Sequence, residues 1–234
     1  MCVRYRSPLA GLLLLAPSLA LLSCPQRLWG EPKPSTPAGA YRVDTRASRV
    51  YIKVGSATRV GHHHGVEGKL KSGRVVFGGK GELVIDTTSF RADTAAARRR
   101  AGLDPEFKPS EARQVTATMR GGRILDVAQF PTATYRIDAI TPLDGQAEGA
   151  AGTYRLAGRF TLHGVERKLR FKAKVGPADQ EARSLPGALL LSGSFTVRQS
   201  DYGIKPYAAL GGVVRVADEL RIWGDVVLIP SPPR

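Results

Sequence analysis

From Tyr41 onward, apolar and polar residues alternate with a period of two, the pattern of strands that have one buried and one solvated face. The clearest case is VERKLRFKAKV, residues 165–175, in which large apolar residues alternate with Lys and Arg. The preceding TYRLAGRFTLHG, residues 153–164, alternates in the same way and ends in His163-Gly164, which suits a tight turn. The two segments therefore predict a β-hairpin.

Further segments have strand-like alternation or composition, and they are residues 48–55, 63–73, 74–86, 132–143, 187–199 and 213–229. About eight strands with Gly-rich turns predict an all-β domain, either a sandwich or a closed barrel, and closure removes exposed edges. One region breaks the pattern. DTAAARRRAG and PSEARQVTATMRG have helix-forming composition, so we expect one or two short helices between residues 93 and 121, crossing outside the sheet or plugging one end.

The N-terminus has the layout of a secretory signal over residues 1–23. Two arginines precede an apolar run that is too short for a transmembrane helix and is interrupted by Pro17. The run ends in LLSC, which resembles the lipobox of bacterial lipoproteins, where Cys24 would be acylated. Ordinary cleavage without a lipid is the alternative. Cys2 leaves with the signal, so the folded domain is expected to have no disulfide and no thiolate chemistry.

These features predict four parts: a lipoprotein-type signal peptide (1–23), the acylated Cys24 with a Pro-rich tether (24–40), a single β domain (41–230) and a tail (231–234). The expected location is the periplasm or cell envelope, with a lipid anchor at Cys24, or otherwise outside the cell. A membrane is then a partner through the anchor.

The charge narrows the choice of other partners. The chain carries a formal net charge of +15, and from Tyr41 onward 31 Lys and Arg face 19 Asp and Glu, a net charge of +12. Such a surface attracts nucleic acid or anionic lipid, and a generic basic surface is the alternative. Because the charges are spread along the body and the destination is secretory, we expect no nucleic-acid partner.

Several motifs of the body follow one another in a distinctive order. They are a histidine before GVEGKL (65–70), GELVIDTTSFRADT (81–94), QFPTATYRI (129–137), GRFTLHGVERKL (158–169), RQSDYGI (198–204) and DELRIWGDVVLI (218–229). This order resembles the YceI family of secreted bacterial proteins, from Tyr41 to about Ile229. The resemblance implies an extended, lipocalin-like antiparallel β-barrel whose relatives hold a polyisoprenoid or similar long-chain amphiphile.

A barrel of about eight strands is wide enough to hold one small apolar ligand or to be filled by its own side chains. An apolar tunnel suffices for an isoprenoid tail, because each isoprene unit gains roughly 3–4 kcal/mol at about 0.8 kcal/mol per buried carbon. We therefore expect non-enzymatic binding of a polyisoprenoid or fatty amphiphile, with a homodimer possible. The expected interior residues are Tyr154, Phe160, Leu162, Leu169, Phe171, Leu191, Phe195 and Ile222.

The region after TTSFRADT departs from the family pattern, in which an Arg-Asp pair is followed by His-Leu. Here three arginines, Arg98 to Arg100, stand in a helix-like run without that partner. This segment is expected to cover the barrel mouth. Its arginines either form a solvated helix face or meet an anionic head group such as a phosphate.

The stretch GHHHG places three of the four histidines in a row. In an extended chain His62 and His64 share one face, and with His163 or a carboxylate they would form a metal site, so a metal-dependent enzyme or metal-binding protein is the alternative function. The preferred interpretation is one histidine that hydrogen-bonds within the barrel beside solvated neighbours. No HExxH, GxSxG, P-loop or dinucleotide-binding pattern occurs, so we expect neither catalysis nor a cofactor.

Overall fold

The computed structural model describes residues 39–143, 145–178 and 186–231. The predicted signal peptide, the proposed acylation site at Cys24 and nearly all of the tether lie outside these ranges. Most of the 231–234 tail does so too.

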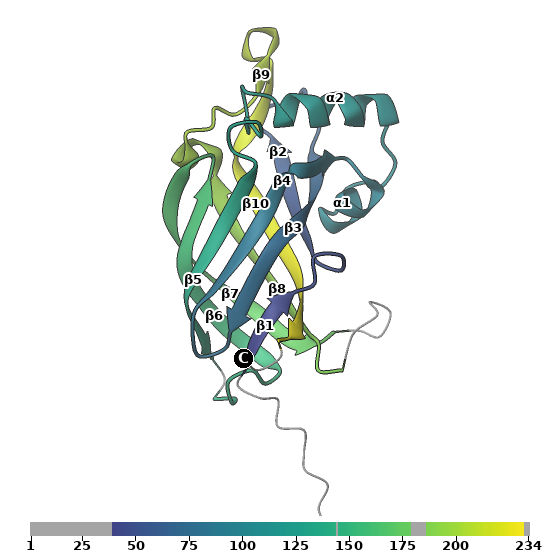
Figure 1. The fold of residues 1–234 in the computed structure, drawn as a ribbon. Helices are drawn as coiled ribbons and strands as arrows, with labels where there is room; N and C mark the ends of the chain where they lie inside the picture. The colour runs from purple at the N-terminus through teal and green to yellow at the C-terminus, as the bar shows by residue number, and fades with distance from the viewer. Residues whose placement is uncertain (1–38, 144, 179–185, 232–234) are drawn as a thin grey trace, which may run out of the picture. The chain divides into compact units, whose positions relative to one another are not determined.

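Eight antiparallel strands form a closed barrel in the order β10-β2-β3-β4-β5-β6-β7-β8, with β8 pairing back to β10 (Figure 1). Their bounds are β2 (Arg49–Ser56), β3 (His64–Val76), β4 (Gly81–Ala92), β5 (Thr132–Pro142), β6 (Gly152–Leu162), β7 (Val165–Pro177), β8 (Leu189–Arg198) and β10 (Val214–Pro230). The all-β, lipocalin-like fold expected from the sequence is confirmed. The sandwich alternative is wrong, because a closed ring of pairings leaves no second sheet.

One strand boundary differs from the expectation of separate segments over 63–73 and 74–86. β3 continues to Val76, and β4 begins only at Gly81. The turn falls at the two glycines between them, where Gly78 has a φ of +70°. Glycine adopts that backbone conformation without the steric penalty of other residues.

The hairpin predicted at His163-Gly164 is confirmed. Leu162 of β6 lies opposite Val165 of β7, which leaves a two-residue turn. His163 and Gly164 have φ values of +50° and +75°, and two consecutive positive values are what the favoured type I′ hairpin turn requires.

Two strands lie between β10 and β3: β2 and the short β1 (Ala40–Val43). β1 pairs with β10 on one side and with β3 on the other, beyond the ends of their pairing with β2. A turn separates β1 from β2, and the Asp44 carboxylate accepts hydrogen bonds from the backbone N–H groups of Arg46 and Ala47 at 2.9 and 3.2 Å. After this turn, the buried Ser48 Oγ accepts a hydrogen bond from the Val227 N–H at 2.9 Å. Ser48 thus satisfies a backbone group of β10 that the strand break leaves unpaired.

Replacing Ser48 with Ala is expected to lower the free energy of unfolding by about 1–3 kcal/mol, because the buried Val227 N–H loses its acceptor. Urea denaturation followed by circular dichroism measures the change. Ser72, an exposed serine on β3, provides the matched control, and its replacement with Ala should stay within about 0.5 kcal/mol. Equal effects of the two substitutions would contradict the role of the buried hydroxyl.

Two α-helices interrupt the sheet between β4 and β5, as expected: α1 (Ala95–Arg100) and α2 (Pro109–Arg120). α1 packs against β3, and α2 crosses one end of the barrel (Figure 1). The close packing of α1 depends on Gly65, where a Cβ atom would lie 2.7 Å from the backbone of Ala97. In the described ranges no helix has the length and apolar composition needed to span a membrane.

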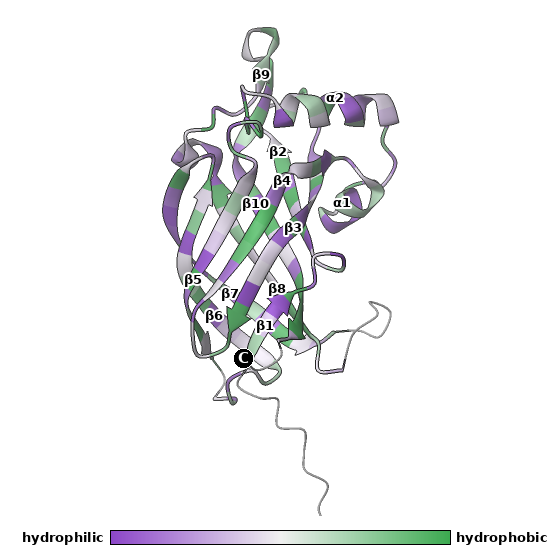
Figure 2. Cartoon of the chain, viewed as in Figure 1, coloured by the Kyte–Doolittle hydropathy of each residue, from purple (hydrophilic) through white to green (hydrophobic). Residues whose placement is uncertain are grey.

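Three smaller elements complete the helical end. The 3₁₀ turn η2 (Gln199–Tyr202) follows β8, and the two-residue β9 (Ala208–Ala209) and the 3₁₀ turn η3 (Leu210–Gly212) precede β10. η2 ends at Gly203, whose φ of +72° lies in the left-handed region that favours glycine. Along the barrel strands, hydrophobic and hydrophilic residues alternate in bands (Figure 2).

Candidate functional site

The barrel encloses a cavity of about 270 Å³ that lies next to α2. All eight barrel strands contribute to its wall, and the lining residues within the described ranges include no Lys, Arg, Asp or Glu. An uncharged concave space of this kind is typical of sites for apolar ligands. The barrel is therefore hollow at the helical end.

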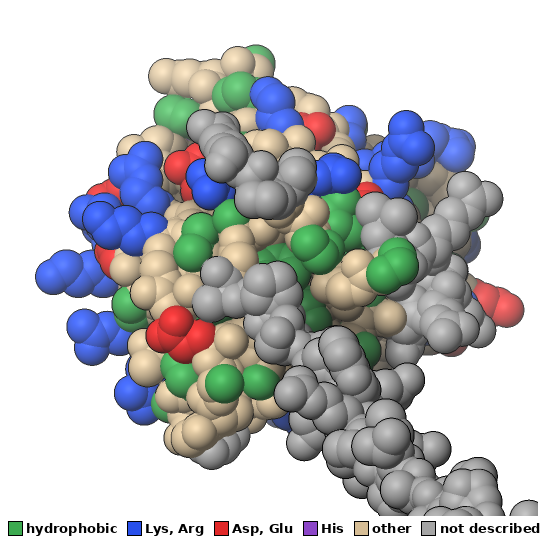
Figure 3. Space-filling model, turned by 60° about the horizontal axis from the view of Figure 1, so that its bottom comes forward, with side chains coloured by type: hydrophobic (Ala, Val, Ile, Leu, Met, Phe, Trp, Pro, Cys, Tyr) green, Lys and Arg blue, Asp and Glu red, His purple; other side chains and the backbone are tan. Residues whose placement is uncertain are grey.

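The opposite end is filled by the protein's own side chains. Tyr41, Phe77 and Tyr154 are almost completely buried there, with ring centroids 5.5 Å apart for Tyr41–Phe77 and 5.3 Å apart for Phe77–Tyr154. The Tyr154 hydroxyl donates to the carbonyl of Ala150 at 2.8 Å, so its polar end is satisfied. Figure 3 turns this end toward the viewer, with hydrophobic side chains near the middle of the face and Lys and Arg toward its sides. The barrel is thus hollow at the helical end and filled by its own side chains at the other end, so each of the two alternatives for its interior holds for one part.

Six of the eight expected interior residues line the cavity, namely Phe160, Leu162, Phe171, Leu191, Phe195 and Ile222. The aromatic members contact one another, with ring centroids 4.9 Å apart for Phe171–Phe195 and 5.7 Å apart for Phe160–Phe195. Two expected residues do not line it. Tyr154 belongs to the filled end, and Leu169 packs against the core from a partly buried position outside the cavity wall. Alternation gives the face on which a side chain lies, but not its height in the barrel.

Other lining residues were not among the sequence candidates. β2 and β4 contribute Val50, Ile52, Leu83 and Ile85, which their period-two pattern marks as inward-facing. α2 and the segment after it line the cavity at the helical end with Val115, Met119, Ile124 and Leu125. The spacing of Val115 and Met119, four residues apart, is the helical signal that would have identified this covering face.

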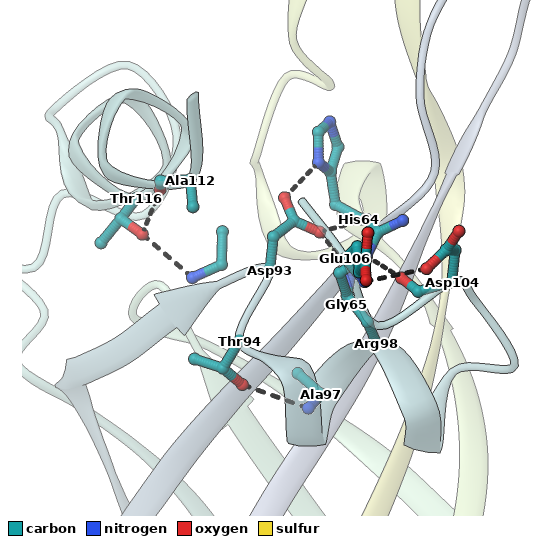
Figure 4. Close-up of polar contacts among 11 residues, drawn as sticks. His64, Gly65, Asp93, Thr94, Ala97, Arg98, Asp104, Glu106, Ala112 and Thr116 are labelled. Carbon is teal, nitrogen blue, oxygen red and sulfur yellow. Dashed lines mark hydrogen bonds and ion pairs between the residues drawn. The ribbon is translucent and has the colours of Figure 1, made fainter. Parts of the chain in front are cut away.

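A buried polar network lies at the helical end of the cavity (Figure 4). The Asp93 carboxylate contacts His64 Nδ1 at 2.6 Å, accepts from the Arg98 guanidinium at 2.9 Å, and accepts from the Gly65 N–H at 3.2 Å. The Asp93 side chain is 0% exposed and that of Arg98 is 9% exposed. Asp93 also has a φ of +53°, a backbone conformation that costs free energy in residues other than glycine.

Opposing effects act on the pKa of Asp93. Burial raises the pKa of its carboxyl, but the hydrogen bond and charge of His64 and the bonds from Arg98 and Gly65 lower it by more. The net pKa lies below the ordinary value. Asp93 is therefore a carboxylate that bridges a histidine and an arginine at neutral pH.

The arginine run at 98–100 fits neither expectation as a unit. Arg98 is buried, pairs with Asp93, donates from Nε to the Asp104 carbonyl, and lies over the Phe107 ring at 4.7 Å. Arg100 pairs with Asp225 at 2.9 Å, whereas Arg99 is exposed. Neither a solvated face nor an anion site describes Arg98, because its charge is already balanced by Asp93. Arg98 therefore has an acidic partner in the folded protein, and that partner is Asp93.

The three candidate metal ligands do not form one cluster. The His62 and His64 rings are 6.5 Å apart, but His64 is held by Asp93, and His163 lies in the β6–β7 turn against Phe130 with ring centroids 4.4 Å apart. His63 Nδ1 accepts a hydrogen bond from the Ser56 N–H at 3.2 Å. Within the part of the chain that the structure describes, no group of three or more His, Cys, Asp or Glu is placed to hold a metal ion.

The closed eight-stranded barrel with an apolar cavity defines a lipocalin-like protein. The match to the YceI-like domain extends over residues 41–228, and the chain belongs to that family. This confirms the resemblance found in the sequence. No curated protein has a sequence that matches the chain.

Two solved structures share this fold at low sequence identity. A polyisoprenoid binding domain from Saccharophagus degradans, implicated in plant cell wall breakdown, has 15% identity and a TM-score of 0.56, with 82% of this chain and 99% of that chain covered. Burkholderia cenocepacia BcnA has 18% identity and a TM-score of 0.50, with 79% of this chain and 98% of that chain covered.

Proposed function

We propose that this protein binds a long-chain apolar or amphiphilic lipid of the polyisoprenoid type in its barrel cavity, without catalysing a reaction. The observation that carries the proposal is the uncharged cavity of about 270 Å³ in an otherwise well-packed barrel. The fold shared with a domain described as polyisoprenoid-binding supports the choice of ligand class.

The energetics of such binding require only apolar contact. The aromatic and aliphatic side chains of the wall offer a surface on which each buried carbon of a ligand gains about 0.8 kcal/mol. At about 270 Å³, the cavity is slightly smaller than the range of roughly 300–1,000 Å³ common for ligand sites. It suits the inner segment of a chain ligand that enters from the helical end, because the other end is filled.

The proposed location is the periplasm or cell envelope, with an anchor at Cys24. The supporting pattern is the LLSC sequence after an apolar run. Mass spectrometry of the mature N-terminal peptide tests this proposal. An acylated Cys24 at the N-terminus is expected, and an unmodified peptide that begins elsewhere would show ordinary secretion.

The ligand itself is tested on purified protein. Native mass spectrometry and organic extraction are expected to release a chain lipid at up to one molecule per barrel, and delipidated protein is expected to take up geranylgeraniol, a 20-carbon isoprenoid alcohol. Absence of a co-purifying lipid together with no uptake of geranylgeraniol would overturn the proposed function.

A further inference from the structure

We infer that His64 recognises a hydroxyl group at the polar end of the ligand, so that the cavity selects an uncharged chain alcohol or phenol. The inference rests on the proposed function, because it assumes that a chain lipid occupies the cavity. It adds the chemistry of the head group and the residue that reads it.

The first step is the state of the His64 ring. Asp93 is a carboxylate and only accepts hydrogen bonds, so the contact of 2.6 Å requires a proton on His64 Nδ1. Nδ1 is thereby committed, and Nε2 has no hydrogen-bond partner among the residues of the described ranges. His64 also lines the cavity, with 16% of its side chain exposed. The ring therefore offers one free nitrogen beside the apolar space.

The second step is the direction of the ligand. His64 is the first residue of β3, at the end of the barrel that α2 crosses (Figure 1). The other hydrogen-bonding side chains of the lining at this end are Gln114 and Thr118 of α2, Gln199 of η2, and Tyr207, which directly precedes β9. The opposite end is filled by apolar packing. A chain lipid therefore satisfies the cavity best with its tail inward and its polar group near His64.

The third step is the charge of the head group. Among the described residues, the cavity lining contains no Lys or Arg, and the Arg98 charge near His64 is balanced by Asp93. Wherever the His64 ring is neutral, a phosphate at this place would be partly desolvated without an opposite charge, which is costly. A hydroxyl carries no charge, and a hydrogen bond to Nε2 offsets the cost of removing it from water. It donates to Nε2 when that nitrogen carries a lone pair and accepts from it when it carries a proton.

The test compares three probes of equal chain length: geranylgeraniol, its methyl ether, and geranylgeranyl phosphate. Each is titrated against delipidated protein by displacement of a fluorescent fatty-acyl probe. In alkaline buffer, which favours the neutral imidazole, wild-type protein is expected to bind the alcohol about tenfold more tightly than the ether, because the ether cannot donate a hydrogen bond to the Nε2 lone pair. The phosphate is expected to bind no more tightly than the alcohol.

His64→Leu is expected to abolish the preference for the alcohol while leaving the affinity for the ether within about twofold. His64→Asn provides an amide N–H that can donate to Asp93 as Nδ1 does, but it has no atom in the place of Nε2. It therefore tests the role of Nε2 if the leucine variant is unstable. His163→Asn, remote in the β6–β7 turn, removes an imidazole, and Asn tolerates its positive φ. It is expected to retain the full preference.

The outcomes separate this inference from the proposed function. If none of the probes binds, the proposed function fails. If all three bind wild-type and His64→Asn proteins alike, the chain lipid is confirmed as a ligand class and the role of His64 is refuted. Tighter binding of the phosphate than of the alcohol would also refute it, because it would require a positive charge at the head group.

Discussion

Replacing Asp93 with Asn is expected to lower the free energy of unfolding by about 3–5 kcal/mol, the largest stability effect of any single substitution considered for this protein. The carboxylate balances the charge of Arg98, whose side chain is only 9% exposed. Without it, a buried guanidinium keeps its charge but loses the opposite charge. Its remaining contacts, the Asp104 carbonyl and the Phe107 ring, are both uncharged.

Asparagine isolates the effect of charge at this position. Asp93 has a φ of +53°, which Asn tolerates as well as Asp does, so the substitution adds no backbone strain. Chemical denaturation measures the loss. Asp138, whose 3.2 Å pair with Arg159 is half exposed, is the matched control, and Asp138→Asn should cost less than about 1 kcal/mol. Removing both buried charges, in Asp93→Asn with Arg98→Met, should restore part of the stability.

The stability difference between wild type and Asp93→Asn depends on pH in a defined direction. The pKa of Asp93 is lowered in the folded state, so its contribution is fully present above the unfolded pKa of about 3.9 and is lost as pH falls through the lower folded value. Unfolding measured from pH 7 down to about pH 3 should show the two proteins converging in acid. A constant difference over this range would contradict an ionised Asp93 as the source.

The barrel could be predicted from the sequence because its signal is local and repeated. Period-two alternation shows which residues of each strand face inward, and the His163-Gly164 pair gives the place of one tight turn. The division of β3 from β4 was missed for the opposite reason. Strand-forming residues continue through Val76 up to the glycine turn, so alternation alone gave no boundary there.

The candidate site was predicted only in part, because it depends on contacts between distant segments. Asp93 and His64 are 29 residues apart and meet only through the pairing of β3 with β4. In sequence, Arg98 is the first of three arginines and has the pattern of an exposed helix face. Its burial follows from the packing of α1 on Gly65, which no periodicity indicates. The cavity likewise depends on which side chains from different strands lie at the same level along the barrel axis, and the pattern within one strand does not give that level.

Replacing Gly224 with Phe is expected to weaken binding of geranylgeraniol roughly 1,000-fold while leaving the fold intact. Gly224 lies on β10 between Val50 of β2 and Gly193 of β8, and it lines the cavity. A Cβ atom there would meet only the Val226 Cγ2 at 3.9 Å, an ordinary van der Waals contact. A benzyl group therefore has room to enter the cavity and to take the place of about one isoprene unit, worth roughly 4 kcal/mol.

The free energy of unfolding separates this effect from damage to the barrel. Glycine weakens a strand interior, and an added ring fills empty apolar space, so Gly224→Phe should be at least as stable as wild type. Gly176 on β7 also has open space around its Cβ position but lies outside the cavity wall, which makes Gly176→Phe the matched control with unchanged affinity. A stable Gly224→Phe protein that binds geranylgeraniol as wild type does would place the ligand outside the barrel. Gly224→Phe is therefore expected to weaken binding by displacing part of the isoprenoid tail. Gly224 has no side chain that could hydrogen-bond the hydroxyl of the ligand, so the substitution removes no contact with the head group.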